Sequence, residues 1–70
     1  MEEKTIENLL SDRELGILRS IAQGLTTPRI AEELHLSPET VKWHRKRMLA
    51  KFSATTSAEM VRRAIEAGIL

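Results

Sequence analysis

Residues 27–52, TPRIAEELHLSPETVKWHRKRMLAKF, decide the fold because two helix starts follow each other closely in this stretch. Each start is a hydroxyl residue followed by proline, namely Thr27-Pro28 and Ser37-Pro38. Such a pair suits the first turn of a helix. The hydroxyl group caps a free N–H group, and proline has no N–H group that would stay unpaired there. The pattern predicts helices near residues 28–35 and 38–52, and the connection at His35 and Leu36 has room only for a tight turn.

Two further helices are predicted on either side of this stretch, near residues 12–23 and 57–67. Both begin with the capping-box pattern, in which a Ser or Thr is followed three residues later by a Glu. These pairs are Ser11 with Glu14 and Thr56 with Glu59. No segment alternates apolar and polar residues as a strand does. We therefore predict an all-α fold, a four-helix bundle that contains a helix-turn-helix.

The chain of 70 residues is long enough for one small domain, which we place at residues 10–70. Residues 1–9 are expected to be a flexible N-terminal segment or the remnant of a linker. There is no cysteine, which excludes disulfides and thiolate metal sites. No apolar run approaches the roughly 20 residues of a membrane span, and the acidic start lacks the apolar part of a secretory signal. We expect a cytoplasmic protein, either a complete regulator or the output part of a longer one.

The net charge of +1 conceals a strong asymmetry along the chain. Residues 1–39 carry four Lys or Arg against eight Asp or Glu, whereas residues 40–70 carry seven against two. Five of those seven basic residues lie within residues 42–51, in the predicted third helix. This distribution indicates a localised electrostatic footprint on an otherwise nearly neutral molecule.

The side chains of the predicted third helix divide into a core stripe and an opposite, basic face. At about 100° per residue, Met48 and Phe52 each fall within about 20° of Val41. The side chains on the opposite side are Glu39, Lys42, Trp43 and Lys46. The chain's one tryptophan is therefore predicted to be exposed, between two lysines.

A basic, exposed helix that follows another helix after a tight turn is the arrangement that enters the major groove of DNA. The groove is about 12 Å wide and admits one helix, whose side chains reach base edges while basic residues attract phosphates. The alternative is a surface tryptophan that packs along a neighbouring side chain or in a crystal or dimer contact. Because exposing an indole brings no benefit by itself, we favour double-stranded DNA as the partner.

The sequence offers little support for other chemistry. The two histidines, His35 and His44, have no cysteine partners, so no metal site is predicted. Glu32 and Glu33 point about 100° apart on a helix and form a solvated face, not an acid–base pair. There is no glycine-rich phosphate loop. We expect no catalytic residue and no cofactor, and hence no enzyme.

The segment LSDRELGILRSIAQGLTTPRIAEELHLSPETVKWHRKRMLAKF, residues 10–52, resembles the LuxR-type helix-turn-helix domain. This domain is also found in FixJ-like and NarL-like response regulators and in the stand-alone GerE regulator. The residues that carry the resemblance are Leu10, Arg13-Glu14, Gly24, Ile30-Ala31, Leu34, Leu36-Ser37, Thr40-Val41-Lys42, His44, Lys51-Phe52 and Gly68. The resemblance extends over residues 10–70.

The resemblance implies a bacterial DNA-binding domain of a transcriptional regulator that recruits or blocks RNA polymerase at promoters. By position, the base-facing residues are Lys42, Trp43 and Lys46. The residues expected to meet phosphates along the flank of the helix are Thr40, His44, Arg47 and, further along, Lys51. The last helix of the family forms its dimer interface.

Four positions depart from the family pattern. Ser53 and Ala54 stand where the family often has glycine and valine. Ser57 stands where the family usually has an arginine, often placed to pair with the glutamate of the first helix. Glu14 is therefore expected to lack that partner. Met60 replaces a residue that is usually a small alanine.

The fourth helix is predicted to mediate a weak homodimer on DNA, because its apolar arc approaches half the circumference and is wider than one core-facing stripe. We expect one edge, led by Val61 and Ile65, to pack on the first helix. The other edge, with Met60, Ala64 and Ala67, is expected to meet a second copy. The alternative is that the whole arc serves the domain's own core.

Two other classes of protein stay open at this point. One is a helical protein-interaction module that binds no nucleic acid and presents an apolar groove. The other is a sigma-factor-like promoter-binding domain, which also contains a helix-turn-helix. The basic, exposed face of the third helix disfavours the first of these.

Overall fold

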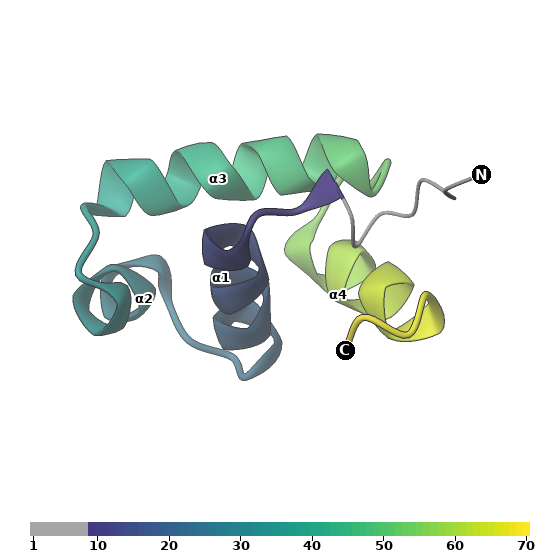
Figure 1. Cartoon of the computed structure of the whole chain (residues 1–70), viewed down its shortest axis with the longest axis horizontal. Helices are drawn as coiled ribbons and strands as arrows, with labels where there is room; N and C mark the ends of the chain where they lie inside the picture. The colour runs from purple at the N-terminus through teal and green to yellow at the C-terminus, as the bar shows by residue number, and fades with distance from the viewer. Residues whose placement is uncertain (1–8) are drawn as a thin grey trace.

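The computed structural model describes residues 9–70, which form four α-helices and no strand (Figure 1). The helices are α1 (Asp12–Ala22), α2 (Thr27–Leu34), α3 (Pro38–Lys51) and α4 (Ser57–Glu66). Every boundary lies within one residue of its expected position, so the predicted all-α fold is confirmed. The expected flexible segment at residues 1–9 lies, apart from Leu9, outside the described residues.

A hydroxyl side chain caps the start of each of these helices. Ser11, Thr26, Ser37 and Thr56 each accept a hydrogen bond from the N–H group three residues further on. The capping box of α1 is complete, because Glu14 also accepts from the N–H of Ser11 at 3.4 Å. The box predicted for α4 is incomplete, since Glu59 accepts from the N–H of Thr55 at 2.7 Å and not from that of Thr56.

The turn between α2 and α3 is closed by His35, which adopts a left-handed conformation with φ of 58°. The N–H of Leu36 donates to the carbonyl of Ala31 at 2.8 Å, which satisfies an acceptor that the end of α2 leaves free. Across the turn, Arg45 donates to the hydroxyl of Thr27 at 3.3 Å. These contacts fix the direction in which α3 leaves α2.

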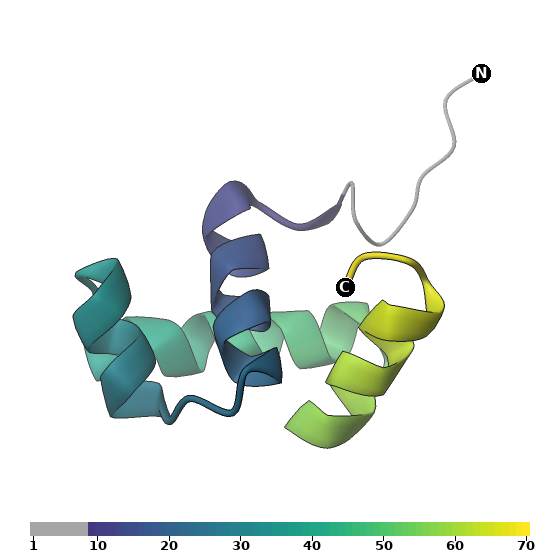
Figure 2. The same cartoon turned by 90° about the horizontal axis from the view of Figure 1, so that it is seen from below.

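The arrangement of the helices leaves one long side of α3 uncovered. α3 lies along one edge of the molecule, with α2 near its N-terminal end and α4 near its C-terminal end (Figure 1). In Figure 2, which views the molecule from below, α1 crosses in front of the middle of α3. The three shorter helices therefore support α3 from one side only.

The core is almost entirely aliphatic. Val41 and Met48 of α3 are fully buried and Phe52 is 2% exposed, which confirms the predicted core stripe. The other buried apolar side chains are Leu10, Ile17, Leu18, Ile30, Ala31, Met60 and Ala64. Within residues 9–70, no helix combines the length and the apolar character needed to cross a lipid bilayer.

The orientation predicted for α4 was wrong. Met60 and Ala64 are fully buried, whereas Ile65 is 57% exposed and Val61 is only partly buried. α4 packs on α1 and α3 together, where the unbranched Met60 side chain can fill an irregular gap and the small Ala64 permits close approach. The side chains of Met60 and Ala64 therefore cannot meet a second copy as predicted. Of the three residues expected at a dimer interface, only Ala67 is exposed.

Candidate nucleic-acid interface

Three exposed side chains, Lys42, Trp43 and Lys46, form the outer face of α3. They lie on the side of the helix opposite Val41 and Met48, as the helical periodicity predicts. Trp43 is 54% exposed although it is the largest apolar side chain of the protein. The outer face therefore combines two positive charges with one accessible indole.

The indole of Trp43 has a defined neighbour on each of two sides. The guanidinium carbon of Arg47 lies 4.7 Å from the ring centroid, within the range of a cation–π contact. The ring of His44 meets the indole edge to face, with centroids 5.0 Å apart and an interplanar angle of 79°. Both neighbours come from α3 itself.

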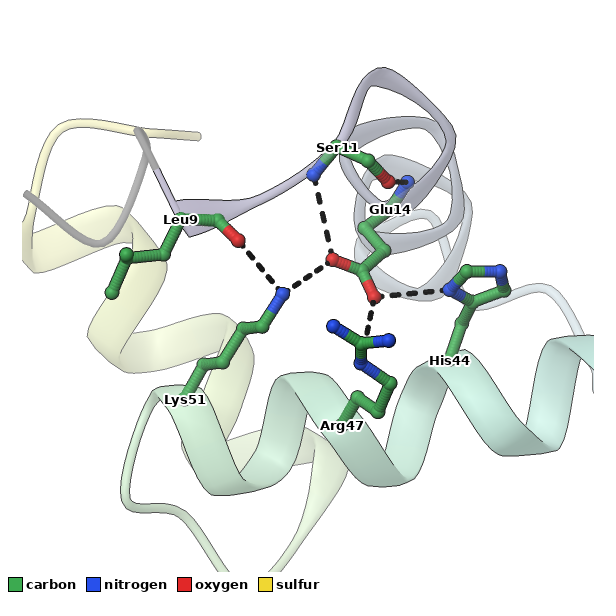
Figure 3. Close-up of polar contacts among 6 residues, drawn as sticks. All are labelled: Leu9, Ser11, Glu14, His44, Arg47 and Lys51. Carbon is green, nitrogen blue, oxygen red and sulfur yellow. Dashed lines mark hydrogen bonds and ion pairs between the residues drawn. The ribbon is translucent and has the colours of Figure 1, made fainter.

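Behind the outer face, one buried carboxylate gathers three basic side chains of α3 (Figure 3). Glu14, whose side chain is 2% exposed, accepts hydrogen bonds from Lys51 Nζ at 2.8 Å and from His44 Nδ1 at 3.0 Å. Arg47 Nε lies 3.8 Å from the same carboxylate. The three partners are spaced three and four residues apart, so they share one stripe of α3 that faces the first turn of α1.

The pKa of Glu14 is held below its ordinary value of 4.5. Burial by itself would raise this pKa, because it disfavours the charged form. The hydrogen bonds from Lys51, His44 and the N–H of Ser11, together with the charge of Lys51, outweigh the effect of burial. Glu14 is therefore ionised at neutral pH. Since a carboxylate only accepts hydrogen bonds, the Nδ1 atom of His44 carries the hydrogen in this pair.

The cluster around Glu14 divides the residues expected to contact DNA into two groups. Lys42, Trp43 and Lys46 of the outer face have no part in it. His44 and Lys51 are only 13% and 20% exposed, and their polar atoms bind Glu14. Arg47 is 49% exposed and lies between the two groups.

Two further contacts tie the ends of α3 to their surroundings. Thr40, in the first turn, is partly buried, and its hydroxyl lies 2.9 Å from that of Ser37. At the other end, Lys51 Nζ also donates to the carbonyl of Leu9 at 2.7 Å. The chain that enters α1 and the last turn of α3 are thus joined through one lysine.

Glu14 is the residue of this site whose role was not predicted from the sequence. The capping box with Ser11 was a sufficient reason for a glutamate at this position. The serine at position 57, where the family usually has an arginine, indicated only that the usual partner of Glu14 is absent. α3 supplies other partners instead. The available signal was the spacing of His44, Arg47 and Lys51, which places three basic residues on one stripe of the helix.

An exposed basic helix held by a tight turn against a second helix defines the class of helix-turn-helix DNA-binding domains. Residues 8–64 match the family described as GerE: Bacterial regulatory proteins, luxR family. The chain belongs to this family, which consists of DNA-binding transcription regulators and is not an enzyme family.

The curated relatives include regulators from several bacteria. The chain is 37% identical over 59 residues to the transcription regulator BvgA of Bordetella pertussis, a match that covers 84% of this chain and 28% of the relative. It is 39% identical over 59 residues to the transcriptional regulatory protein FixJ of Rhizobium meliloti, covering 84% of this chain and 29% of the relative. It is 50% identical over 44 residues to the nitrate/nitrite response regulator protein homolog of Haemophilus influenzae, covering 63% and 21%. The chain thus spans less than a third of the length of these relatives.

Proposed function

We propose that the chain binds bacterial promoter DNA sequence-specifically by placing α3 in the major groove. The observation that carries this proposal is the outer face of α3, where the exposed Trp43 lies between two exposed lysines. A groove about 12 Å wide admits one helix. Because α3 lies along an edge of the molecule, it can enter the groove ahead of the helices that support it (Figure 1).

The outer face supplies the contacts that distinguish bases. Lys42 and Lys46 donate to acceptors such as guanine O6 and N7, or to the nearest phosphates. Trp43 makes apolar contact with a thymine methyl group or a sugar edge. We propose that Thr40 contacts a phosphate, since hydroxyl and N–H groups at the start of a helix bind phosphate oxygens.

We further propose a weak homodimer on DNA that uses the exposed edge of α4. This edge consists of Ala58, Val61 and Ile65, and it adjoins an open apolar groove that Ile21 and Ala22 of α1 also line. Covering Ile65 with a second copy would remove exposed apolar surface from water. A two-fold pair would set two α3 helices about one turn of DNA apart, which suits a palindromic site.

The relatives suggest the setting in which this domain works. They are named as transcription regulators and as a response regulator. We propose that this chain is the DNA-binding output part of such a regulator. In this proposal it acts in the bacterial cytoplasm, where promoter DNA lies, and contacts RNA polymerase there.

The test begins with selection of bound fragments from random double-stranded DNA, followed by affinity measurements on the selected operator. Lys42→Ala and Lys46→Ala are each expected to weaken binding about 5- to 150-fold, the range for losing one base-edge contact. The control is Arg19→Ala, which removes an exposed positive charge from the last turn of α1 and should weaken binding by no more than about twofold. If Lys46→Ala binds the operator as well as the parent protein does, α3 does not enter the groove in this orientation.

A further inference from the structure

Both neighbours of the Trp43 ring bind the same buried carboxylate. Arg47 lies over the ring at 4.7 Å and reaches Glu14 with its Nε atom at 3.8 Å. His44 meets the ring at 5.0 Å and reaches Glu14 with its Nδ1 atom at 3.0 Å. The first turn of α1 is therefore linked to the outer face of α3 by two short chains of contacts that converge on one indole.

The inner end of these chains is held by further contacts. Glu14 is almost fully buried, and it also accepts from Lys51 Nζ at 2.8 Å and from the N–H of Ser11 at 3.4 Å. An exposed side chain on a helix ordinarily exchanges among several rotamers. A ring that contacts two side chains anchored on a fixed group loses much of that freedom.

The geometry of Arg47 suits this role better than a lysine would. A guanidinium is planar, so its face can stack on an indole while its edge meets a carboxylate. An ammonium group is a compact point charge and cannot present a face and an edge at once. The positive charge alone would be sufficient if Arg47 served only to attract a phosphate.

We infer that Glu14, acting through Arg47 and His44, is a positioning residue that fixes the Trp43 indole before DNA arrives. The fixed ring then sets the base preference at the step that Trp43 reads. The second part of this inference rests on the proposed function, whereas the first part concerns the free protein alone.

The free protein provides the first test. Trp43 is the one tryptophan and there is no tyrosine, so time-resolved fluorescence anisotropy reports the motion of this ring alone. In Arg47→Lys and Arg47→Ala, the ratio of restricted to mobile indole is expected to fall about two- to fivefold. This is the change in an equilibrium that the loss of an exposed cation–π contact produces. Lys46→Ala serves as the control for ring motion, because it removes an exposed neighbour whose charge does not lie over the ring.

Glu14→Gln separates the anchor from the stacking group. It keeps Arg47 and His44 in place along the chain but removes the charge that holds them, so the indole should become mobile as it does in Arg47→Ala. Because Glu14 is buried, the helical content of this variant is checked by circular dichroism, and Arg47→Lys decides the matter if Glu14→Gln unfolds. An indole equally restricted in the parent, Arg47→Lys and Arg47→Ala would overturn the inference.

The second test measures base preference. The affinity of the parent and of Arg47→Lys is compared on the selected operator and on operators with single base-pair changes. For each protein, the affinity for the selected operator is divided by the affinity for an altered operator. Since lysine keeps the charge, a change in this ratio between the parent and Arg47→Lys reports the geometry of the contact. The ratio is expected to fall about two- to fivefold at one step, and Trp43→Ala should remove this effect of the lysine substitution. Ratios that match the parent at every step would make Arg47 a plain phosphate contact.

The two tests fail in different ways. A chain that binds no DNA would refute the proposed function, while the anisotropy of the free protein would still decide whether Glu14 positions the ring. A mobile indole in the parent protein would refute the positioning role and leave DNA binding by α3 intact.

Discussion

Glu14 shows how one residue can serve both the fold and the candidate interface. It completes the cap of α1, and it holds two basic side chains of α3 at hydrogen-bond distance. A buried carboxylate is costly to remove from water, and the structure offsets that cost with several donors. Losing the charge would leave Lys51, which is only 20% exposed, without its counter-ion.

Glu14→Gln is therefore expected to lower the free energy of unfolding by about 1.5–3 kcal/mol at neutral pH, the range for hydrogen bonds to charged groups. Urea unfolding followed by circular dichroism measures this loss. The control is Glu66→Gln, because the ion pair of Glu66 with Arg62 is 63% exposed on both sides and should contribute less than about 0.5 kcal/mol. Equal small losses in the two variants would contradict the importance of the buried cluster.

The lowered pKa of Glu14 predicts a stability component that acid removes. Because the folded pKa lies below the ordinary value of 4.5, the unfolded chain takes up the proton first as the pH falls. The contribution of Glu14 is thus fully present above about pH 5 and is lost as the pH falls through the folded pKa. The difference in unfolding free energy between the parent and Glu14→Gln should shrink as the pH falls below the ordinary pKa of 4.5.

A second glutamate has a lowered pKa but does not disturb this comparison. The pKa of Glu59 is also lowered, mainly by the hydrogen bond from the N–H of Thr55. Since Glu59 is present in both proteins, its effect cancels in the difference. A difference that stays constant or grows as the pH falls below 4.5 would contradict the lowered pKa of Glu14.

At the scale of the helix, the sequence predicts starts and ends well because capping acts within one turn of chain. Each hydroxyl cap lies within a residue of its predicted position. In α3, the charged side chains occupy one side of the helix, so only the opposite side could form the core stripe. α4 has two apolar edges, and which of them packs depends on α1 and α3, so periodicity alone selected the wrong one. The cluster around Glu14 joins residues 30 positions apart along the chain, a distance that no local pattern reports.

Gly16 offers a test of how α1 is built. It lies inside the helix, and a Cβ atom added there would meet no neighbour within 4 Å. Gly16→Ala is expected to raise the free energy of unfolding by about 0.5–1 kcal/mol, because alanine loses less backbone entropy on folding. Thermal unfolding checks the change.

Gly24 provides the matched control at the end of the same helix. Its φ of +86° is strained for any residue with a Cβ atom, so Gly24→Ala is expected to destabilise the protein. Stabilisation by both substitutions, or by neither, would contradict these backbone assignments.

At the scale of the whole molecule, the two most exposed large apolar side chains among residues 9–70 mark the two proposed contact surfaces. Trp43 is 54% exposed on the outer face of α3, and Ile65 is 57% exposed on α4. The opposite side of each helix packs in the core, as Met48 and Ala64 illustrate. One surface is assigned to DNA and the other to a second copy of the chain.

Substitutions on α4 distinguish its two edges. Ile65→Glu is expected to leave the domain folded and to abolish the advantage of a full operator over a half operator. Ala64→Glu is expected to unfold the domain, because it places a carboxylate in a fully buried position. Circular dichroism and binding to both operators provide the measurement. If Ile65→Glu keeps the full-site advantage, α4 is not the dimer interface.

The most direct measurement of the central claim is acrylamide quenching of Trp43 fluorescence with and without the selected operator. The 54% exposed ring should be quenched readily in the free protein and should become several-fold less accessible when the operator covers the outer face of α3. Retardation of labelled operator on a gel confirms that the complex has formed under the same conditions. Unchanged quenching in a fully formed complex would show that DNA binds elsewhere and that α3 does not enter the groove by its outer face.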